Sequence, residues 1–343
     1  MITRYSPLLL AGSLWFSAAS SLPAQIYTFG TLAGDPTIVD INEDPIGDYA
    51  DGTNSQAHFN FPQAIAADAA GNLYVADTLN NAIRKVARVG GEWVVTTVAG
   101  SGPTVTGSNA GTNAQAQFNF PQGVAVDSSG NLYVADLGNY AIRKITPAGD
   151  DWVVTTIAGA AESPGTNDGP GNVARFYMPA SVAVDAANNV YVADYGQTDY
   201  GANTIRKLQL VGTNWVVSTI AGAFRQVGSA DGTNDQARFN GVGSLAADSA
   251  GRVYLSDWYN RTIRRIAPVG TNYVVTTLAG KADSPDPLPV DGAGGNARFS
   301  DALGGVGVDG SGNLYVTDSG MIRKITPVET NWLVTTIAGA YGQ

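Results

Sequence analysis

FNFPQGVAVDSSGNLYVADLGNYAIRKITPAGDDWVVTTIAG, residues 118–159, is the stretch that decides the fold of this 343-residue chain. Its LYVAD element recurs with small changes, and the copies end at Asp77, Asp136, Asp194, Asp257 and Asp318, which are 59, 58, 63 and 61 residues apart. Self-similarity at a nearly fixed period is the signature of a repeat architecture. The chain is therefore predicted to consist of five copies of one structural unit.

Each copy has the pattern of four short strands. In the quoted stretch these are Gly123–Asp127, Leu132–Asp136, Ala141–Ile145 and Trp152–Ile157, rich in β-branched and aromatic residues and separated by Gly, Asn, Asp and Ser. No window has the 3.6-residue period of a helix, so almost no helix is expected in the mature chain. Four antiparallel strands repeated at this period predict an all-β propeller. Five copies favour five blades, and six blades are the alternative.

Some spacings within the repeat are constant and others drift. Nine residues separate Asp127 from Asp136, and nine separate Arg143 from Trp152; every copy keeps both values. The gap between the two members of each Asp and Arg pair is 7, 7, 12, 7 and 5 residues in copy order. The constant turns, first-to-second and third-to-fourth, lie on one rim of a propeller, here named the constant rim. The second-to-third turns and the links between blades form the opposite, variable rim, where binding is expected.

Aromatic residues concentrate in the variable-rim segments of the third and fourth copies. The candidate ligand-binding residues are Tyr140, Tyr195, Tyr200, Phe224, Arg225, Trp258 and Tyr259. Exposed aromatics beside arginine and asparagine suit a peptide or glycan surface. The alternative is that these side chains fold down onto their own blades.

An aspartate and an arginine recur together in every copy. The pairs are Asp77 with Arg84, Asp136 with Arg143, Asp194 with Arg206, Asp257 with Arg264 and Asp318 with Arg323. Their recurrence favours a structural role, in which the carboxylate caps a turn and pairs with the arginine of the next strand. A ring of charges that binds an ion or ligand at the channel mouth is the alternative.

The N-terminal segment predicts export. Residues 1–24 have a basic start, a short apolar run and a cleavage-type Leu22-Pro23-Ala24, which indicate a secretory signal peptide and a periplasmic or extracellular protein with no membrane insertion. Residues 25–50 are predicted to form a closing strand, Ile26–Gly34, and a linker, and residues 51–343 the propeller. The closing strand resembles a fourth strand, although the last copy already has its own.

The composition of the chain excludes several kinds of partner and of functional site. A formal net charge of −10 argues against nucleic acid as a partner, and the absence of cysteine excludes disulfides and thiol chemistry. His58 is the only histidine, so a three-histidine zinc site cannot form. No catalytic residue and no cofactor is predicted. A calcium site of Asp and Asn ligands stays open, and it would be sought first at Asp51, Asp168, Asp231 and Asp291.

The repeat P-x-G-V-A-V-D-x-x-G-N-L-Y-V-A-D-x-x-N-x-x-I-R-K-I resembles the NHL repeat. With D-G-x-x-x-x-A-R-F before it, it is similar to bacterial secreted NHL proteins and to the NHL region of teneurins, and it occurs at Asp51–Ile83, Gly111–Ile142, Asp168–Ile205, Asp231–Ile263 and Asp291–Ile322. The resemblance implies a β-propeller, usually of six blades, that serves as a binding platform.

Together these observations predict a secreted, monomeric, non-enzymatic propeller that recognises a protein or a glycan through its variable rim. The alternative is a metal-dependent lyase or lactonase-type enzyme with a site in the central channel. A third interpretation is a purely structural surface module.

Overall fold

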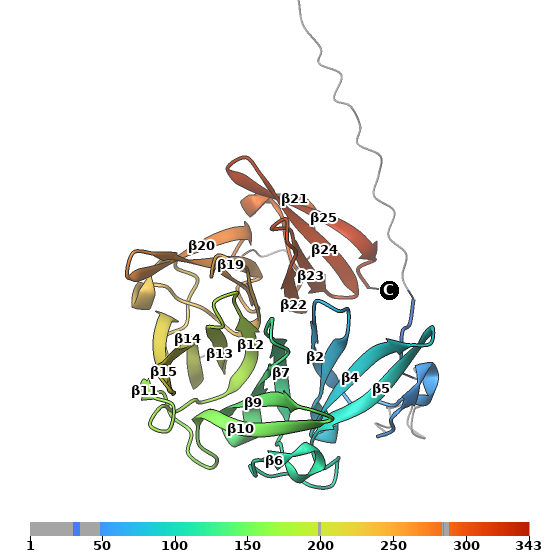
Figure 1. Ribbon diagram of the computed structural model, residues 1–343. Helices are drawn as coiled ribbons and strands as arrows, with labels where there is room; N and C mark the ends of the chain where they lie inside the picture. Colours follow the sequence, from blue (N-terminus) through green and yellow to red (C-terminus); the bar gives the residue numbers. More distant parts are fainter. Residues whose placement is uncertain (1–29, 35–48, 198–199, 283, 285–287, 343) are drawn as a thin grey trace, which may run out of the picture. The chain divides into compact units, whose positions relative to one another are not determined.

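In the computed structural model, which describes residues 30–34, 49–197, 200–282, 284 and 288–342, residues 31–343 form a single unit that contains five β-sheets (Figure 1). Each sheet is one sequence repeat, so the prediction of a five-bladed all-β propeller is confirmed. The only helical elements in the described residues are six 3-10 helices of three residues each. They are η1 (Asn54–Gln56), η2 (Thr78–Asn80), η3 (Asn113–Gln115), η4 (Leu137–Asn139), η5 (Asn234–Gln236) and η6 (Gly294–Asn296).

The strands of each blade have the following bounds. Blade 1 has β1 (Gly52–Thr53), β2 (Pro62–Ala67), β3 (Leu73–Asp77), β4 (Ala82–Val89) and β5 (Glu92–Ala99). Blade 2 has β6 (Gly111–Thr112), β7 (Pro121–Val126), β8 (Leu132–Asp136), β9 (Ala141–Ala148) and β10 (Asp151–Gly159). Blade 3 has β11 (Gly169–Pro170), β12 (Pro179–Val184), β13 (Val190–Gln197), β14 (Tyr200–Val211) and β15 (Asn214–Gly222). Blade 4 has β16 (Gly232–Thr233), β17 (Val242–Ala247), β18 (Val253–Asp257), β19 (Thr262–Val269) and β20 (Asn272–Gly280). Blade 5 has β21 (Gly292–Ala293), β22 (Leu303–Val308), β23 (Leu314–Asp318), β24 (Met321–Val328) and β25 (Asn331–Gly339).

Each blade has five strands rather than the predicted four. The additional strand has two residues and pairs antiparallel with the fourth long strand, as Gly52 does opposite Val95, so the order in blade 1 is β1-β5-β4-β3-β2. It belongs to the segment that was interpreted as the link between blades. That segment runs along the outer edge of its own blade before it turns inward to the first long strand, and it thereby covers an edge that would otherwise expose unpaired backbone groups.

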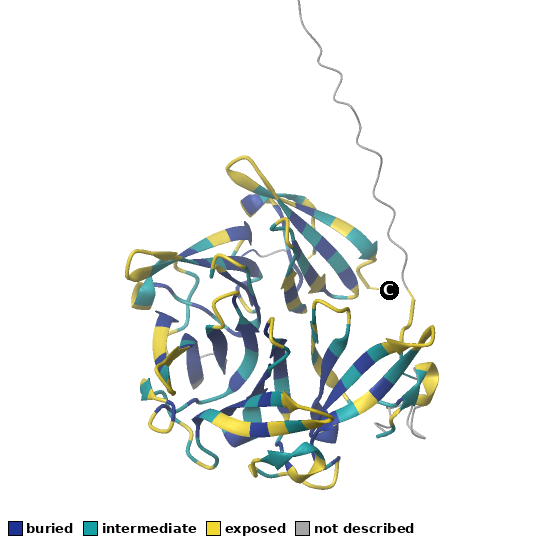
Figure 2. Cartoon of the chain, viewed as in Figure 1, coloured by how far each residue is buried: buried dark blue, intermediate teal, exposed yellow. Residues whose placement is uncertain are grey.

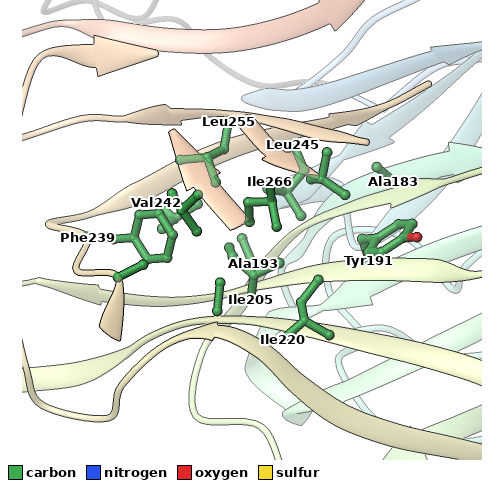
Figure 3. Close-up of a cluster of buried hydrophobic side chains, with 14 residues drawn as sticks. Ala183, Tyr191, Ala193, Ile205, Ile220, Phe239, Val242, Leu245, Leu255 and Ile266 are labelled. Carbon is green, nitrogen blue, oxygen red and sulfur yellow. The ribbon is translucent and has the colours of Figure 1, made fainter. Parts of the chain in front are cut away.

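The first long strands lie innermost and contact one another in the series β2, β7, β12, β17 and β22. Apolar side chains fill the space between consecutive blades. Between blades 3 and 4, Ala193 and Ile205 face Val242 and Ile266, with Phe239 at one side (Figure 3). The second long strands are covered on both faces, so that every residue of β8 and β18 is buried, whereas the fourth long strands such as β10 also have exposed residues (Figure 2).

The predicted signal peptide, residues 1–24, lies outside the described residues. Of the predicted closing strand Ile26–Gly34, only Gly30–Gly34 is described, and this part has no strand structure. No helix in the described part of the chain has the length and apolar character required to cross a membrane.

Candidate functional site

The first-to-second turns of the constant rim all have the same structure. In blade 2, Asp127 Oδ1 accepts hydrogen bonds from the backbone N–H groups of Ser129 and Asn131, each at 2.9 Å, and Oδ2 accepts from Asn131 Nδ2 and from the Tyr133 hydroxyl at 2.8 and 3.1 Å. Equivalent bonds form at Asp68, Asp185, Asp248 and Asp309. Because each carboxylate is occupied by its own turn, the constant spacing has a structural cause.

A fully buried arginine lies beneath the variable rim in every blade. In blade 1, Arg84 donates to Asp77 Oδ2 at 2.6 Å and to Asp51 Oδ1 at 2.7 Å, and its guanidinium lies 5.2 Å from the centre of the Phe59 ring. The five predicted pairs are all ion pairs, with N–O distances of 2.6 Å (Asp77–Arg84), 2.9 Å (Asp136–Arg143), 3.4 Å (Asp194–Arg206), 2.7 Å (Asp257–Arg264) and 2.7 Å (Asp318–Arg323).

The aspartate of each of these five ion pairs also holds the backbone in place. Asp136 accepts from the backbone N–H of Asn119 at 2.8 Å and from Asn139 Nδ2 at 2.7 Å. Burial raises the pKa of Asp136, Asp194 and Asp257 to about 6, although the paired arginine and the hydrogen bonds oppose this effect. These carboxylates fix the segment that enters each blade against the second-to-third turn.

The four aspartates considered for calcium are each bound to their own blade. Asp231 Oδ1 accepts from Arg264 Nη2 at 2.8 Å and from the Thr277 hydroxyl at 3.0 Å, and its Oδ2 accepts from the Thr277 N–H at 3.0 Å. Asp51, Asp168 and Asp291 make the same contacts. Among the described residues, no group of three or more His, Cys, Asp or Glu side chains is placed to hold a metal ion.

Three of the predicted ligand-binding aromatics meet on the variable rim, and we name Tyr195, Trp258 and Tyr259 the aromatic patch. The rings of Trp258 and Tyr259 are stacked, with centroids 5.4 Å apart and planes 4° apart. Burial together with the neighbouring Tyr259 hydroxyl raises the pKa of Tyr195. Trp258 Nε1 donates to the carbonyl of Asp301. The patch therefore joins blades 3, 4 and 5, and Tyr259 remains 39% exposed.

A glycine makes room for the patch. Blades 1 and 2 have Phe61 and Phe120 at the position before the first long strand, whereas blade 4 has Gly241. Gly241 has a φ of +77°, and a Cβ at this position would lie 2.6 Å from Cδ2 of Tyr259. The substitution of a bulky side chain by glycine therefore lets the Tyr259 ring lie against the backbone, a local departure from the repeat.

Phe224 packs edge-on against Tyr177 at 6.0 Å, and the guanidinium of Arg225 lies over Phe224 at 5.0 Å. Tyr140 ends η4 in blade 2 in the left-handed conformation. Tyr200 begins β14, and its side chain is outside the described part of the structure.

A cavity of about 330 Å³ opens at the centre of the blades. It is lined by residues on or beside the first long strands of all five blades and by Trp258. Its polar side chains are all uncharged, namely Gln63, Gln122, Ser181 and Ser244. The two serine hydroxyls also accept backbone hydrogen bonds from the next blade, from Leu245 at 3.0 Å and from Val306 at 3.2 Å.

Sequence reasoning missed these four cavity residues. A signal was present, because Gln63 and Gln122 are polar residues directly after a proline in otherwise apolar strands. The repeat alone, however, cannot tell which face of a first strand lies toward the axis. Trp258, which belongs both to the aromatic patch and to the cavity lining, connects the two features.

Comparison with known proteins agrees with this architecture. The family described as the teneurin NHL domain matches residues 50–146. NHL repeat-containing protein 2 of Homo sapiens is 26% identical over 309 residues, which are 82% of this chain and 40% of that protein. These matches and the five blades support a resemblance to NHL-repeat β-propellers.

Two further proteins are similar to this chain. Protein SUPPRESSOR OF QUENCHING 1, chloroplastic, of Arabidopsis thaliana is 27% identical over 300 residues, which are 84% of this chain and 27% of that protein. The chain thus spans less than half the length of both curated relatives. An auxiliary nutrient binding protein from Bacteroides ovatus shares the fold, with a TM-score of 0.53 and 18% identity over 88% of this chain and 76% of that one.

Proposed function

We propose that this propeller is a binding protein that recognises an uncharged glycan through the aromatic patch and the adjoining axial cavity. The observation that carries the proposal is the stacked Trp258–Tyr259 pair, partly exposed and next to a cavity whose polar side chains are two amides and two hydroxyls. Aromatic faces take up the apolar faces of sugar rings, and amides and hydroxyls both donate and accept hydrogen bonds to sugar hydroxyls.

Charge supports a neutral ligand. The chain has a net charge of −10, and the one ion pair beside the patch, Arg261 with Asp301 at 3.2 Å, is already formed. An anionic ligand would be repelled by the whole molecule and would find no charged group in the cavity lining. We further propose that the protein acts as a monomer. We also propose that it acts outside the cytoplasm after removal of residues 1–24, and the N-terminal pattern supports this location.

The test is a glycan array and a peptide array probed with the purified chain. We expect binding to neutral glycans and at least tenfold weaker binding for Tyr259→Ala, because an aromatic contact at the centre of a site contributes about 2 kcal/mol. Tyr140→Ala is the matched control, since it removes a tyrosine of the same rim in blade 2. Thermal unfolding of both variants shows whether the fold is kept.

Three results would contradict the proposal. Absence of glycan binding would refute it, and peptide binding lost in Tyr259→Ala would make the patch a protein interface. Release of a chemically altered ligand would favour the lyase or lactonase-type enzyme.

A further inference from the structure

Blade 4 departs from the repeat at two positions that carry charge. Arg252 stands where the other four blades have asparagine, and Arg265 stands where they have lysine. The asparagines are Asn72, Asn131, Asn189 and Asn313, and the lysines are Lys85, Lys144, Lys207 and Lys324. In a chain whose blades are otherwise nearly alike, two such departures in one blade point to a role that belongs to that blade alone.

Both arginines line one pocket, of about 590 Å³, on the constant rim between blades 4 and 5. Three of its lining side chains, Tyr254, Arg265 and Thr276, lie directly opposite one another across β18, β19 and β20, and therefore on one face of blade 4. Trp332 of blade 5 contributes to the lining, and its ring meets that of Tyr254 edge-on at 6.2 Å. The pocket thus lies over the junction of two blades and joins arginine to an aromatic wall.

Arg265 has no partner within the protein. In the part of the chain that the structure describes, it forms no hydrogen bond or ion pair, and its Nε is buried. The hydroxyl of Thr276, in the same lining, is also buried and without a hydrogen-bond partner. Arg252 is bound only through Nε, which donates to Asp248 Oδ2 at 2.5 Å. A ligand that supplies acceptors to these donors would remove the cost of leaving them unsatisfied.

The two guanidinium groups act on the same region of the pocket. Burial raises the pKa of Tyr254 and Asp248 adds to this effect, whereas the positive charges of Arg252 and Arg265 oppose it. Glu329 also belongs to the lining, yet it forms no ion pair with either arginine. The net charge of −10 is spread over the whole chain, and salt screens exposed charges beyond about 8 Å. A guanidinium in contact with a ligand therefore outweighs the distant carboxylates.

We propose that this pocket is a binding site for an oxyanion, the carboxylate or phosphate group of a small ligand, with Arg265 as the main contact and Arg252 as the second. A planar guanidinium donates two parallel hydrogen bonds to either group, which the lysine of the other blades cannot do. The pocket lies on the rim opposite the aromatic patch, so this site is independent of the glycan site proposed above.

The experiment returns blade 4 to the repeat. The double variant Arg252→Asn with Arg265→Lys carries the residues of the other four blades at both positions, so it should fold, and its thermal midpoint shows whether it does. Isothermal titration calorimetry compares glucose 6-phosphate, glucuronate and glucose, which share a sugar ring and differ in the charged group. We expect a charged sugar to bind the unsubstituted chain and to bind the double variant about tenfold more weakly or less. Binding of glucuronate indicates a carboxylate ligand, and binding of glucose 6-phosphate indicates a phosphate ligand. Glucose should not distinguish the two chains.

Two further variants control for charge. Arg88→Asn removes an exposed arginine of blade 1 and changes the net charge by the same amount as the double variant, so it should alter the affinity by less than about twofold. Glu329→Gln should strengthen binding about threefold, because it removes a negative charge from the lining. The proposal is overturned if neither charged sugar binds the unsubstituted chain, if the double variant binds them equally well, or if Glu329→Gln weakens binding.

Discussion

At the scale of single residues, the buried arginine of each blade is the feature that holds the variable rim in place. Arg264 joins two carboxylates, Asp257 at 2.7 Å and Asp231 at 2.8 Å, and lies over Phe239 at 5.2 Å. The carboxylate of Asp257 is fully buried, so neither Asp257 nor Arg264 could lose its partner without a large desolvation cost. The carboxylate of Asp231, here called the outer carboxylate, is about half exposed, and its contribution to the stability of the fold is therefore smaller.

Blade 2 lacks the outer carboxylate and offers a direct test of its value. Ala110 stands where the other blades have aspartate, and Arg143 Nη2 donates only to the Asn109 carbonyl, at 2.9 Å. We expect Ala110→Asp to raise the free energy of unfolding by about 0.5–1 kcal/mol, because the new carboxylate would accept from Arg143 and Thr156.

The reverse change, Asp231→Ala, should lower the free energy of unfolding by about 1–2 kcal/mol, because Arg264 and Thr277 both lose an acceptor. Urea unfolding of both variants provides the measurement. A neutral or destabilising Ala110→Asp would show that the outer carboxylate serves another purpose than stability.

At the scale of the elements, the two kinds of turn differ in what holds them together. The constant-rim turn of blade 2 depends on four hydrogen bonds to Asp127, which require a fixed number of residues. The second-to-third turn of blade 3 is longer by five residues. Asp194 there accepts from the Tyr177 N–H, as Asp136 accepts from the Asn119 N–H, and it accepts from the Met178 N–H in place of an asparagine side chain. The variable rim therefore accommodates a change of length by exchanging hydrogen-bond donors.

This difference predicts unequal tolerance to insertions. A Gly-Ser-Gly insertion after Val105, in the link between blades 1 and 2 on the variable rim, should lower the free energy of unfolding by less than about 1 kcal/mol, since loop closure entropy grows slowly with length. The same insertion after Ser128 should cost about 2–3 kcal/mol, because it separates Asp127 from its donors. Thermal and urea unfolding measure both, and equal costs would contradict this account of the two rims.

At the scale of the whole molecule, the series of blade contacts has an open flank at blade 1, where Ile65 is 63% exposed, whereas its equivalent in blade 2, Val124, is 5% exposed. Ile65→Asp should change the free energy of unfolding by no more than about 0.5 kcal/mol, because the side chain is exposed. Val124→Asp, the matched change in blade 2, should cost about 3 kcal/mol or more, because it buries a carboxylate without a partner. Similar losses in the two variants would mean that Ile65 is covered in solution.

The fold could be predicted from sequence because the repeat is written five times. Constant intervals such as that from Asp127 to Asp136, and turn signals such as Ser128–Asn131, determine the strands and turns by local chemistry alone, whereas the five copies favoured five blades and left six open. The recurring Asp and Arg pairs could be identified for the same reason. The two-residue outer strands could not, because Gly52–Thr53 acquires its strand conformation only by pairing with β5.

The candidate site depends on distances between blades, which no repeat period contains. Trp258 and Tyr259 were visible as aromatics that break the pattern, but their connection to Tyr195 of blade 3 and Asp301 of blade 5 follows from how three blades pack. The same packing brings Gln63 and Ser244 to one cavity. The sequence by itself therefore determined the blade, its internal ion pairs and its two kinds of turn, which are local. The meeting of side chains from different blades and the open flank at Ile65 were decided by the tertiary structure, because they arise from packing between units whose sequences are nearly alike.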